Sequence, residues 1–124
     1  TDTLNGGAGN DTYRNAQGDV IAELGNGGVD LQQADTQDVA LAANVERGQL
    51  LGSADLQVLG NALHNLLTGN TGANLLDGRA GNDTLNGGFG ADTLVGGAGN
   101  DVLNGGNDGD LFRFAAAGNG SDTS

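Results

Sequence analysis

The sequence predicts an all-β solenoid in which nonapeptide repeats stack, with two repeats per coil. Three observations carry this prediction. Glycine supplies 25 of the 124 residues, well above its average share of about 7%. A nine-residue pattern, G-G-x-G-x-D-x-U-x with U a large apolar residue, recurs along the chain. Each acidic position is followed by a short run rich in Thr, Val and Leu, which favours strands, and short repeats of loop and strand are typical of solenoids.

The copies of the repeat differ in quality along the chain. The strong copies cover residues 6–14, 78–86, 87–95, 96–104 and 105–113. Two weaker copies, at 60–68 and 69–77, have Asn65 and Asn74 where the strong copies have aspartate.

The spacing within one repeat predicts a tight loop followed by a short strand. Glycines at positions 1, 2 and 4 permit positive φ and close backbone approach, which suits a loop whose carbonyls point to one place, and position 6 adds a carboxylate. Only the middle residue of each short strand points inward, because side chains alternate along a strand. Loops on the same side of the solenoid should then be separated by two full repeats. The predicted inward column is Leu67, Leu76, Leu85, Leu94, Leu103 and Phe112.

These repeats resemble the RTX, or hemolysin-type, calcium-binding repeat family, closely over 60–113 and 1–14 and more loosely over 15–59. The resemblance implies a right-handed parallel β-roll in which each Ca²⁺ lies between stacked loops and is shared by two aspartates and by backbone carbonyls. Calcium prefers six to eight oxygen ligands, and stacked loops of this kind supply oxygen donors.

The resemblance, carried over residue by residue, implies two strong calcium sites and up to four or more in total. Asp83 would share one ion with Asp101, and Asp92 would share a second with Asp110. Weaker sites would pair Asn65 with Asp83 and Asn74 with Asp92, because an amide oxygen brings no charge. Asp11 lies in a strong copy, but its possible partner loop, 25–30, is shifted by one residue. The backbone ligands would come from Gly78, Ala80, Gly81, Gly87, Gly88, Phe89, Gly90, Gly96, Gly97, Ala98, Gly99, Gly105, Gly106 and Asn107.

The chain divides into four predicted parts. Residues 1–14 end a first repeat block, 15–59 form an irregular β joining segment, 60–113 form the β-roll and 114–124 form a truncated C-terminal cap. Within the joining segment we expect strands at 18–23 and 29–33 and an interruption at Gly48 and Gln49. The predicted core of this segment is Val45, Leu51, Leu56 and Val58.

Composition and charge exclude several classes of protein. The net charge of −12 argues against nucleic-acid and anionic-membrane partners. The absence of cysteine excludes a disulfide scaffold, a zinc finger and a cysteine nucleophile. No apolar run is long enough to span a membrane. The inward column is small and the aspartates repel one another, so we expect the roll to be largely unfolded without calcium and to fold when calcium binds.

The resemblance implies a calcium-binding structural module of a secreted or cell-surface bacterial protein, passed through a type I secretion channel and folded outside the cell beside adjoining domains. An alternative is an extracellular polysaccharide-binding module attached to a secreted enzyme such as an alginate epimerase, lipase or protease. A third hypothesis, an enzyme built on a β-helix, is disfavoured because no catalytic constellation is present: His64 is expected in an exposed loop, and nothing orients Glu23 or Glu46. An uncapped roll would expose strand edges, so end-to-end self-association is also expected.

Overall fold

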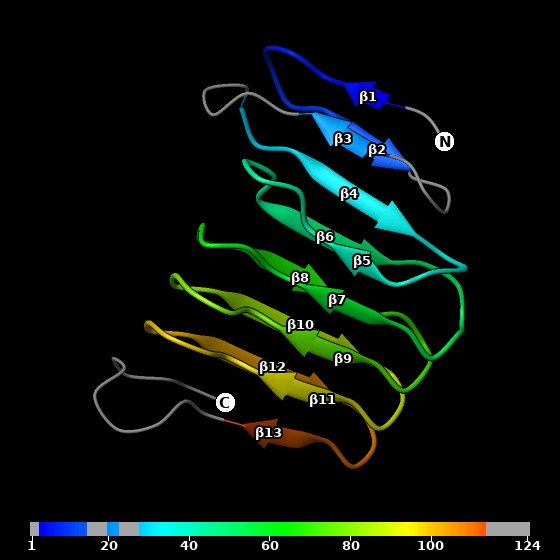
Figure 1. The fold of residues 1–124 in the computed structure, drawn as a ribbon. Helices are drawn as coiled ribbons and strands as arrows, with labels where there is room; N and C mark the ends of the chain where they lie inside the picture. The colour runs from blue at the N-terminus through cyan, green and yellow to red at the C-terminus, as the bar shows by residue number, and fades with distance from the viewer. Residues whose placement is uncertain (1–2, 15–19, 23–27, 114–124) are drawn as a thin grey trace.

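The computed structural model describes residues 3–14, 20–22 and 28–113, and over these residues the chain is all-β (Figure 1). The described part of the chain contains no helix that could span a membrane. Every strand is short, as expected when tight loops alternate with brief extended segments. The all-β solenoid predicted from the repeats is therefore confirmed.

Most of the strands form two parallel sheets that lie against each other along the molecule (Figure 1). The six-stranded sheet consists, in order, of β12 (Val102–Gly106), β10 (Thr84–Gly88), β8 (Leu66–Thr68), β6 (Arg47–Leu50), β4 (Leu31–Ala34) and β2 (Thr12–Arg14). The five-stranded sheet consists of β13 (Leu111–Arg113), β11 (Thr93–Val95), β9 (Leu75–Asp77), β7 (Gln57–Leu59) and β5 (Val39–Ala40). A third pair joins β1 (Thr3–Asn5) to β3 (Val20–Ala22).

The register of the sheets shows that two repeats make one coil in the region predicted as the roll. Leu66 pairs with Thr84, and Thr84 pairs with Val102. On the other sheet Leu75 pairs with Thr93 in the same way. Each step equals two nonapeptides, so loops of the same side stack directly above one another. This spacing brings the aspartates of every second repeat into neighbouring coils.

The coils before residue 60 continue the same sheets with a different spacing. Leu31 pairs with Arg47, a step shorter than two nonapeptides, and Arg47 pairs with Leu66, a step longer than two nonapeptides. The segment predicted to be an irregular joining region therefore adds strands β4 to β7 to the two sheets without keeping the period of the repeat.

The core is a single column of side chains between the sheets. Leu67, Leu76, Leu85 and Leu94 have no exposed surface, and Leu103 is buried as well. These are five of the six predicted inward residues. The sixth, Phe112, is only partly buried and packs against the end of the column. The alternation of buried and partly exposed residues along each short strand produces this column, as the repeat predicts.

Two details of the joining segment correct the sequence-based expectations. Leu50, and not Leu51, fills the core, because β6 runs through Gly48 and Gln49 instead of stopping there. A Cβ placed on Gly48 would lie 2.7 Å from Val58 Cγ2, so the glycine makes room for the opposite sheet. Val45 and Val58 are fully buried and Leu56 packs against the core, as predicted.

The segment also buries a polar side chain. Gln32 is 3% exposed and occupies an inward position of β4. Its side-chain oxygen accepts a hydrogen bond from Ala42 N, and its Nε2 donates to Ala40 O. The amide is satisfied by backbone groups, so it is tolerated where an apolar residue was expected.

Some predicted features lie outside the described residues. They are the C-terminal cap at 114–124, Glu23, and the first residues of the loop proposed as the partner of Asp11.

Candidate metal centres

The position-six aspartates of successive coils are joined in ladders. Asp83 N donates to Asp101 Oδ1 over 2.8 Å, and Asp92 N donates to Asp110 Oδ1 over 2.9 Å. The two-repeat coil and the left-handed glycines in the loops bring each carboxylate beside the stacked loop of the preceding coil. The structure therefore brings together both pairs of aspartates that the repeat predicts. Their role as metal ligands stays a prediction.

This ladder uses only one oxygen of each carboxylate. Asp83 and Asp92 are each 1% exposed, and the Oδ2 atoms of both have no hydrogen-bond partner among the described residues. Buried polar atoms are nearly always paired with a donor or an ion, because burying an unpaired charge is costly. The second oxygen of each carboxylate is thus available to a cation.

Each of these carboxylate oxygens shares the space beside a loop glycine with a carbonyl oxygen of the next coil. A Cβ placed on Gly78 would lie 2.5 Å from Asp83 Oδ2 and 2.8 Å from Gly96 O. For Gly87 the corresponding distances, to Asp92 Oδ2 and Gly105 O, are 2.5 and 2.7 Å. No side chain separates the two oxygens because the first residue of each loop is glycine. Oxygen donors of this kind, gathered from two coils, are what calcium prefers.

The protonation behaviour of the aspartates reflects the same environment. Burial, with smaller contributions from the charges of Asp101 and Asp77, raises the pKa of Asp83 from its ordinary value of 3.8 to about 7, although the hydrogen bond from Asn65 N opposes the increase. Burial likewise raises the pKa of Asp92, helped by Asp110 and Asp108. Without a cation, the folded chain disfavours the charged form of both carboxylates.

The glycines at positions 2 and 4 adopt the backbone conformation that the repeat predicts. Position 2 has φ of 89° at Gly97 and 87° at Gly106, and position 4 has φ of 91° at Gly90 and 117° at Gly99. Arg79 holds the same left-handed conformation at position 2, with φ of 70°. This region is open to glycine and strained for most other residues.

The loop carbonyls predicted as ligands lie in these stacked turns. Two contacts between coils use them or their neighbours: Ala98 N donates to Arg79 O, and Asn107 N donates to Gly88 O. A carbonyl oxygen has two lone pairs, so such a hydrogen bond leaves one available. Coordination by the predicted carbonyls stays a prediction.

Asn65 and Asn74 occupy position 6 in their loops and continue the ladders. Asn65 N donates to Asp83 Oδ1 and Asn74 N donates to Asp92 Oδ1, each over 2.7 Å. The structure therefore places them beside the aspartates with which they were paired. Their side-chain amides are already hydrogen-bonded to neighbouring groups, which distinguishes them from the aspartates.

The ladder extends further toward the N-terminus than the repeat indicated. Asp11 N donates to Asp30 Oδ1 over 2.8 Å, and Asp30 N donates to Glu46 Oε2 over 2.9 Å. The Oδ2 atoms of Asp11 and Asp30 have no hydrogen-bond partner within the described ranges, and Asp30 is fully buried. Glu46, which the sequence left without any orienting group, is held by this ladder. Asp30 ends loop 25–30, which was predicted as the partner of Asp11. The signal that could have found Glu46 is its place directly before β6, since position 6 of the repeat precedes a strand.

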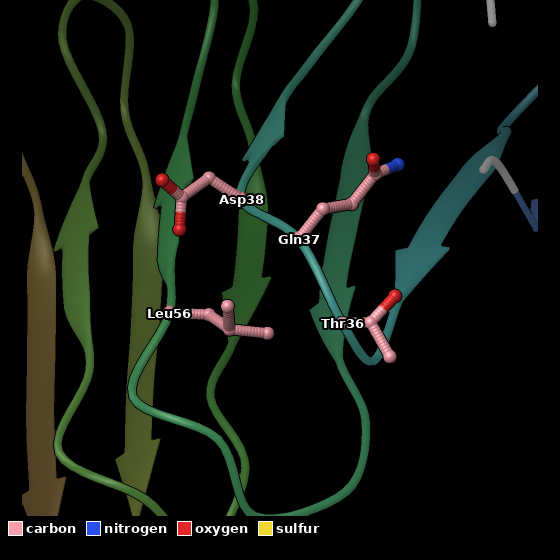
Figure 2. Close-up of a pocket in the computed structure, with 4 residues that line it drawn as sticks. All are labelled: Thr36, Gln37, Asp38 and Leu56. Carbon is pink, nitrogen blue, oxygen red and sulfur yellow. The ribbon is translucent and has the colours of Figure 1, made fainter. Parts of the chain in front are cut away.

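No other part of the described chain assembles a reactive group of side chains. His64 is exposed in its loop, as predicted. No cluster of three or more His, Cys, Asp or Glu side chains suited to a metal occurs among the described residues. A pocket of about 520 Å³ beside β5 is lined by Thr36, Gln37, Asp38 and Leu56. Figure 2 shows that the Asp38 and Gln37 side chains point away from each other, and Asp38 Oδ1 accepts a hydrogen bond from Gln57 N.

Comparison with protein-family models identifies the repeat. The model described as RTX calcium-binding nonapeptide repeat matches in four copies, over residues 1–21, 59–94, 80–112 and 87–123. Together these matches cover well over half of the chain. A search of curated proteins and of solved structures found no match.

Proposed function

Since this chain belongs to the RTX calcium-binding nonapeptide repeat family, and is by that membership a calcium-binding repeat module, we propose that its stacked loops hold Ca²⁺ between neighbouring coils and that the roll folds when these ions bind. The observation that carries the proposal is the set of buried carboxylate oxygens without a hydrogen-bond partner in the described structure, Asp83 Oδ2 and Asp92 Oδ2 foremost. A divalent cation supplies the missing partner.

The electrostatics of the ladder favour a bound cation. Neighbouring carboxylates in a ladder repel each other, and removing them from water adds a desolvation cost. A divalent ion shared by two coils offsets both effects and links the coils. At a calcium concentration 1,000 times its dissociation constant, each ion would stabilise the folded state by about 4.1 kcal/mol.

Three hydrogen-bonded pairs of position-six residues from neighbouring coils contain two carboxylates, and these pairs suit a calcium ion best. In the roll these are Asp83 with Asp101 and Asp92 with Asp110. Toward the N-terminus, Asp11 with Asp30 forms a third. Asn65 with Asp83 and Asn74 with Asp92 offer one carboxylate each, so these sites should be weaker.

The experiment that tests this function is far-UV circular dichroism of the chain, first in chelator and then in millimolar calcium. We expect a gain of β signal with calcium and little gain with magnesium, which demands a small octahedral shell and keeps its waters. An unchanged spectrum between chelator and calcium would contradict folding on binding.

The proposed biological setting follows from this dependence on calcium. Coils that fold only with calcium stay extended in a low-calcium cytoplasm and fold where calcium is abundant, outside the cell. This favours a role as a structural part of a bacterial protein exported by a type I system, beside the domains that carry its activity. Secretion of a reporter fused to the chain, with and without the secretion channel, tests this setting.

A further inference from the structure

Two loops of the roll are built differently from the rest. Loops 60–65 and 69–74 have asparagine at position 2, where most strong repeats have glycine, and asparagine again at position 6, where those repeats have aspartate. We propose that each asparagine pair takes the place of a cation, so that these two loops close onto the preceding coils without metal. This proposal rests on the proposed function in one respect: the aspartate loops, with which the asparagine loops are compared, are taken to bind calcium.

The first asparagine pair, Asn61 and Asn65, connects its loop to the loop of the preceding coil. Asn61 Nδ2 donates to Ala42 O over 2.9 Å and to Val45 O over 2.7 Å. Asn61 Oδ1 accepts from Leu63 N, and Asn61 N donates to Asn65 Oδ1, each over 2.9 Å. Asn65 Nδ2 in turn donates to Asn61 Oδ1 over 3.0 Å. The hydrogen-bonding groups of both side-chain amides are therefore occupied, partly within their own loop and partly by the preceding coil.

The second pair repeats this arrangement on the opposite side of the solenoid. Asn70 Nδ2 donates to Leu51 O and Ala54 O, over 2.9 and 3.0 Å. Asn70 Oδ1 accepts from Gly72 N, and Asn70 N donates to Asn74 Oδ1, each over 2.8 Å. The acceptors lie 19 and 16 residues before the asparagine in both loops. The same contacts on both sides show that the motif, and not one local sequence, produces them.

The aspartate loops do not make these contacts. Position 2 of these loops has positive φ at Gly97 and Gly106. A Cβ added at Gly97 would collide with the carbonyl of Arg79 in the preceding coil, and one added at Gly106 would collide with the carbonyl of Gly88. No side chain can therefore enter the space between those loops. Asn61 and Asn70 are not among the residues with positive φ, and their side chains do enter it.

The two kinds of loop meet carbonyl groups of a neighbouring coil by different means. In an aspartate loop, a carbonyl of the next coil and a carboxylate oxygen that needs a cation lie beside the same glycine. In an asparagine loop, the neutral N–H₂ group at position 2 donates to carbonyls of the preceding coil. The amide oxygen at position 6 accepts from the backbone of its own loop. The asparagine pair adds no charge, so no counter-ion is needed.

The coils that carry the asparagine loops also bury apolar side chains. Val45, Leu50, Val58, Leu67 and Leu76 all belong to the buried core in this part of the solenoid. The chain therefore contains a metal-independent block, strands β6 to β9, on which the calcium-dependent coils β10 to β13 stack.

Hydrogen exchange of the full chain in chelator tests the proposal directly. We expect amides of β8 and β9 to stay protected while those of β11 and β12 exchange rapidly, and calcium to protect all four strands. Exchange of β8 and β9 as fast as β11 and β12 in chelator would overturn the proposal while leaving calcium-dependent folding intact. Protection of β8 and β9 in chelator without any response of β11 and β12 to calcium would support it and contradict the proposed function instead.

An isosteric variant separates the amide donor from simple packing. Asn70→Asp keeps the acceptor for Gly72 N but removes the donor to Leu51 O and Ala54 O. In chelator it should lower the protection of β9 by at least about tenfold, the effect of losing two ordinary hydrogen bonds, and calcium should restore it. Asn104→Asp, which makes the same charge change at an exposed position, is the control and should have no effect. Equal protection of Asn70→Asp and the unsubstituted chain in chelator would overturn the proposal.

Discussion

At the scale of single residues, the two oxygens of one carboxylate have different surroundings. Oδ1 of Asp83 accepts a backbone hydrogen bond from Asn65 N, and Oδ1 of Asp92 accepts one from Asn74 N. Oδ2 of Asp83 or Asp92 is buried without a donor in the described part of the chain. One oxygen therefore fixes the position of the side chain, and the other is left for a ligand. This division assigns to each position-six aspartate both a structural and a binding role.

Replacing Asp92 with asparagine tests the binding role. The new amide would carry no charge toward an ion, so Asp92→Asn should weaken calcium binding by about tenfold to a hundredfold, the effect of one charge-assisted contact of about 1.5–3 kcal/mol. Calcium titration followed by circular dichroism measures the change. Asp55→Asn is the matched control, since Asp55 is exposed and asparagine can still accept from Ala73 N. An equal loss of calcium affinity in both variants would show that the effect comes from the overall charge and contradict a direct contact between Asp92 and the ion.

The first glycine of a loop should be as sensitive as the aspartate. A Cβ on Gly87 would lie 2.5 Å from Asp92 Oδ2, so Gly87→Ala must displace the carboxylate. We expect a loss of about 1–3 kcal/mol in the calcium-bound state, measured by urea unfolding. Gly109→Ala, whose Cβ would meet nothing within 4 Å, should be nearly neutral. A neutral Gly87→Ala would show that the space beside this glycine is not required.

Burial of Asp83 predicts a pH dependence whose sign depends on calcium. Its pKa is raised from 3.8 to about 7 in the folded chain, so between these values the folded state holds a proton that the unfolded state releases. In chelator the folded state should therefore be most stable below about pH 4 and lose stability as the pH rises through 7. With calcium the trend reverses, because protons compete with the ion for the carboxylate. Far-UV circular dichroism in chelator and urea midpoints in calcium, each at pH 5 and pH 8, measure the two trends, and Asp83→Asn should weaken both.

Sequence reasoning found the residues that obey the repeat and missed those that act through a neighbouring coil. The spacing of two nonapeptides was enough to pair Asp83 with Asp101. Asp30 belongs to the loop predicted as the partner of Asp11, but Glu46 joins the same ladder across a step of 16 residues, which no fixed period reveals. The role of Asn61 depends on the Ala42 and Val45 carbonyls, whose positions follow from the fold of a different coil. Contacts between irregular coils therefore need the structure.

At the scale of elements, each strand of the roll contributes one inward side chain to a narrow core. The short strands of the roll could be predicted because the repeat fixes where each loop ends. The strand β6 could not, because Gly48 suggests a break in the sequence but serves in the structure to admit Val58 and Leu41 of the facing coil. Burial by Leu50 in place of Leu51 follows from the same continuation of the strand.

Removing one inward side chain should show how strongly the fold depends on this narrow core. Leu94 in β11 has no exposed surface, so Leu94→Ala should cost about 2–5 kcal/mol and raise the calcium concentration needed for folding. Val95→Ala removes a partly exposed outward side chain of the same strand and should cost less than about 1 kcal/mol. Denaturant unfolding at saturating calcium distinguishes the two. Similar losses would contradict the inward–outward alternation.

At the scale of the whole molecule, the composition acquires a physical explanation. Many of the 25 glycines form loops that admit no side chain, and much of the charge of −12 lies on carboxylates arranged along the coils. The narrow core, the repulsion between carboxylates and the unpartnered oxygens all predict a fold that is completed by ions. The asparagine loops divide this solenoid into a block that needs no metal and coils that do.

Calorimetric titration of the chain with calcium tests the central claim most directly. The two aspartate pairs of the roll, Asp83 with Asp101 and Asp92 with Asp110, predict at least two ions bound per chain. The heat should include that of folding, and the double variant Asp83→Asn, Asp92→Asn should bind fewer ions. A chain that binds no calcium, or a double variant that binds as many ions as the unsubstituted chain, would contradict this account.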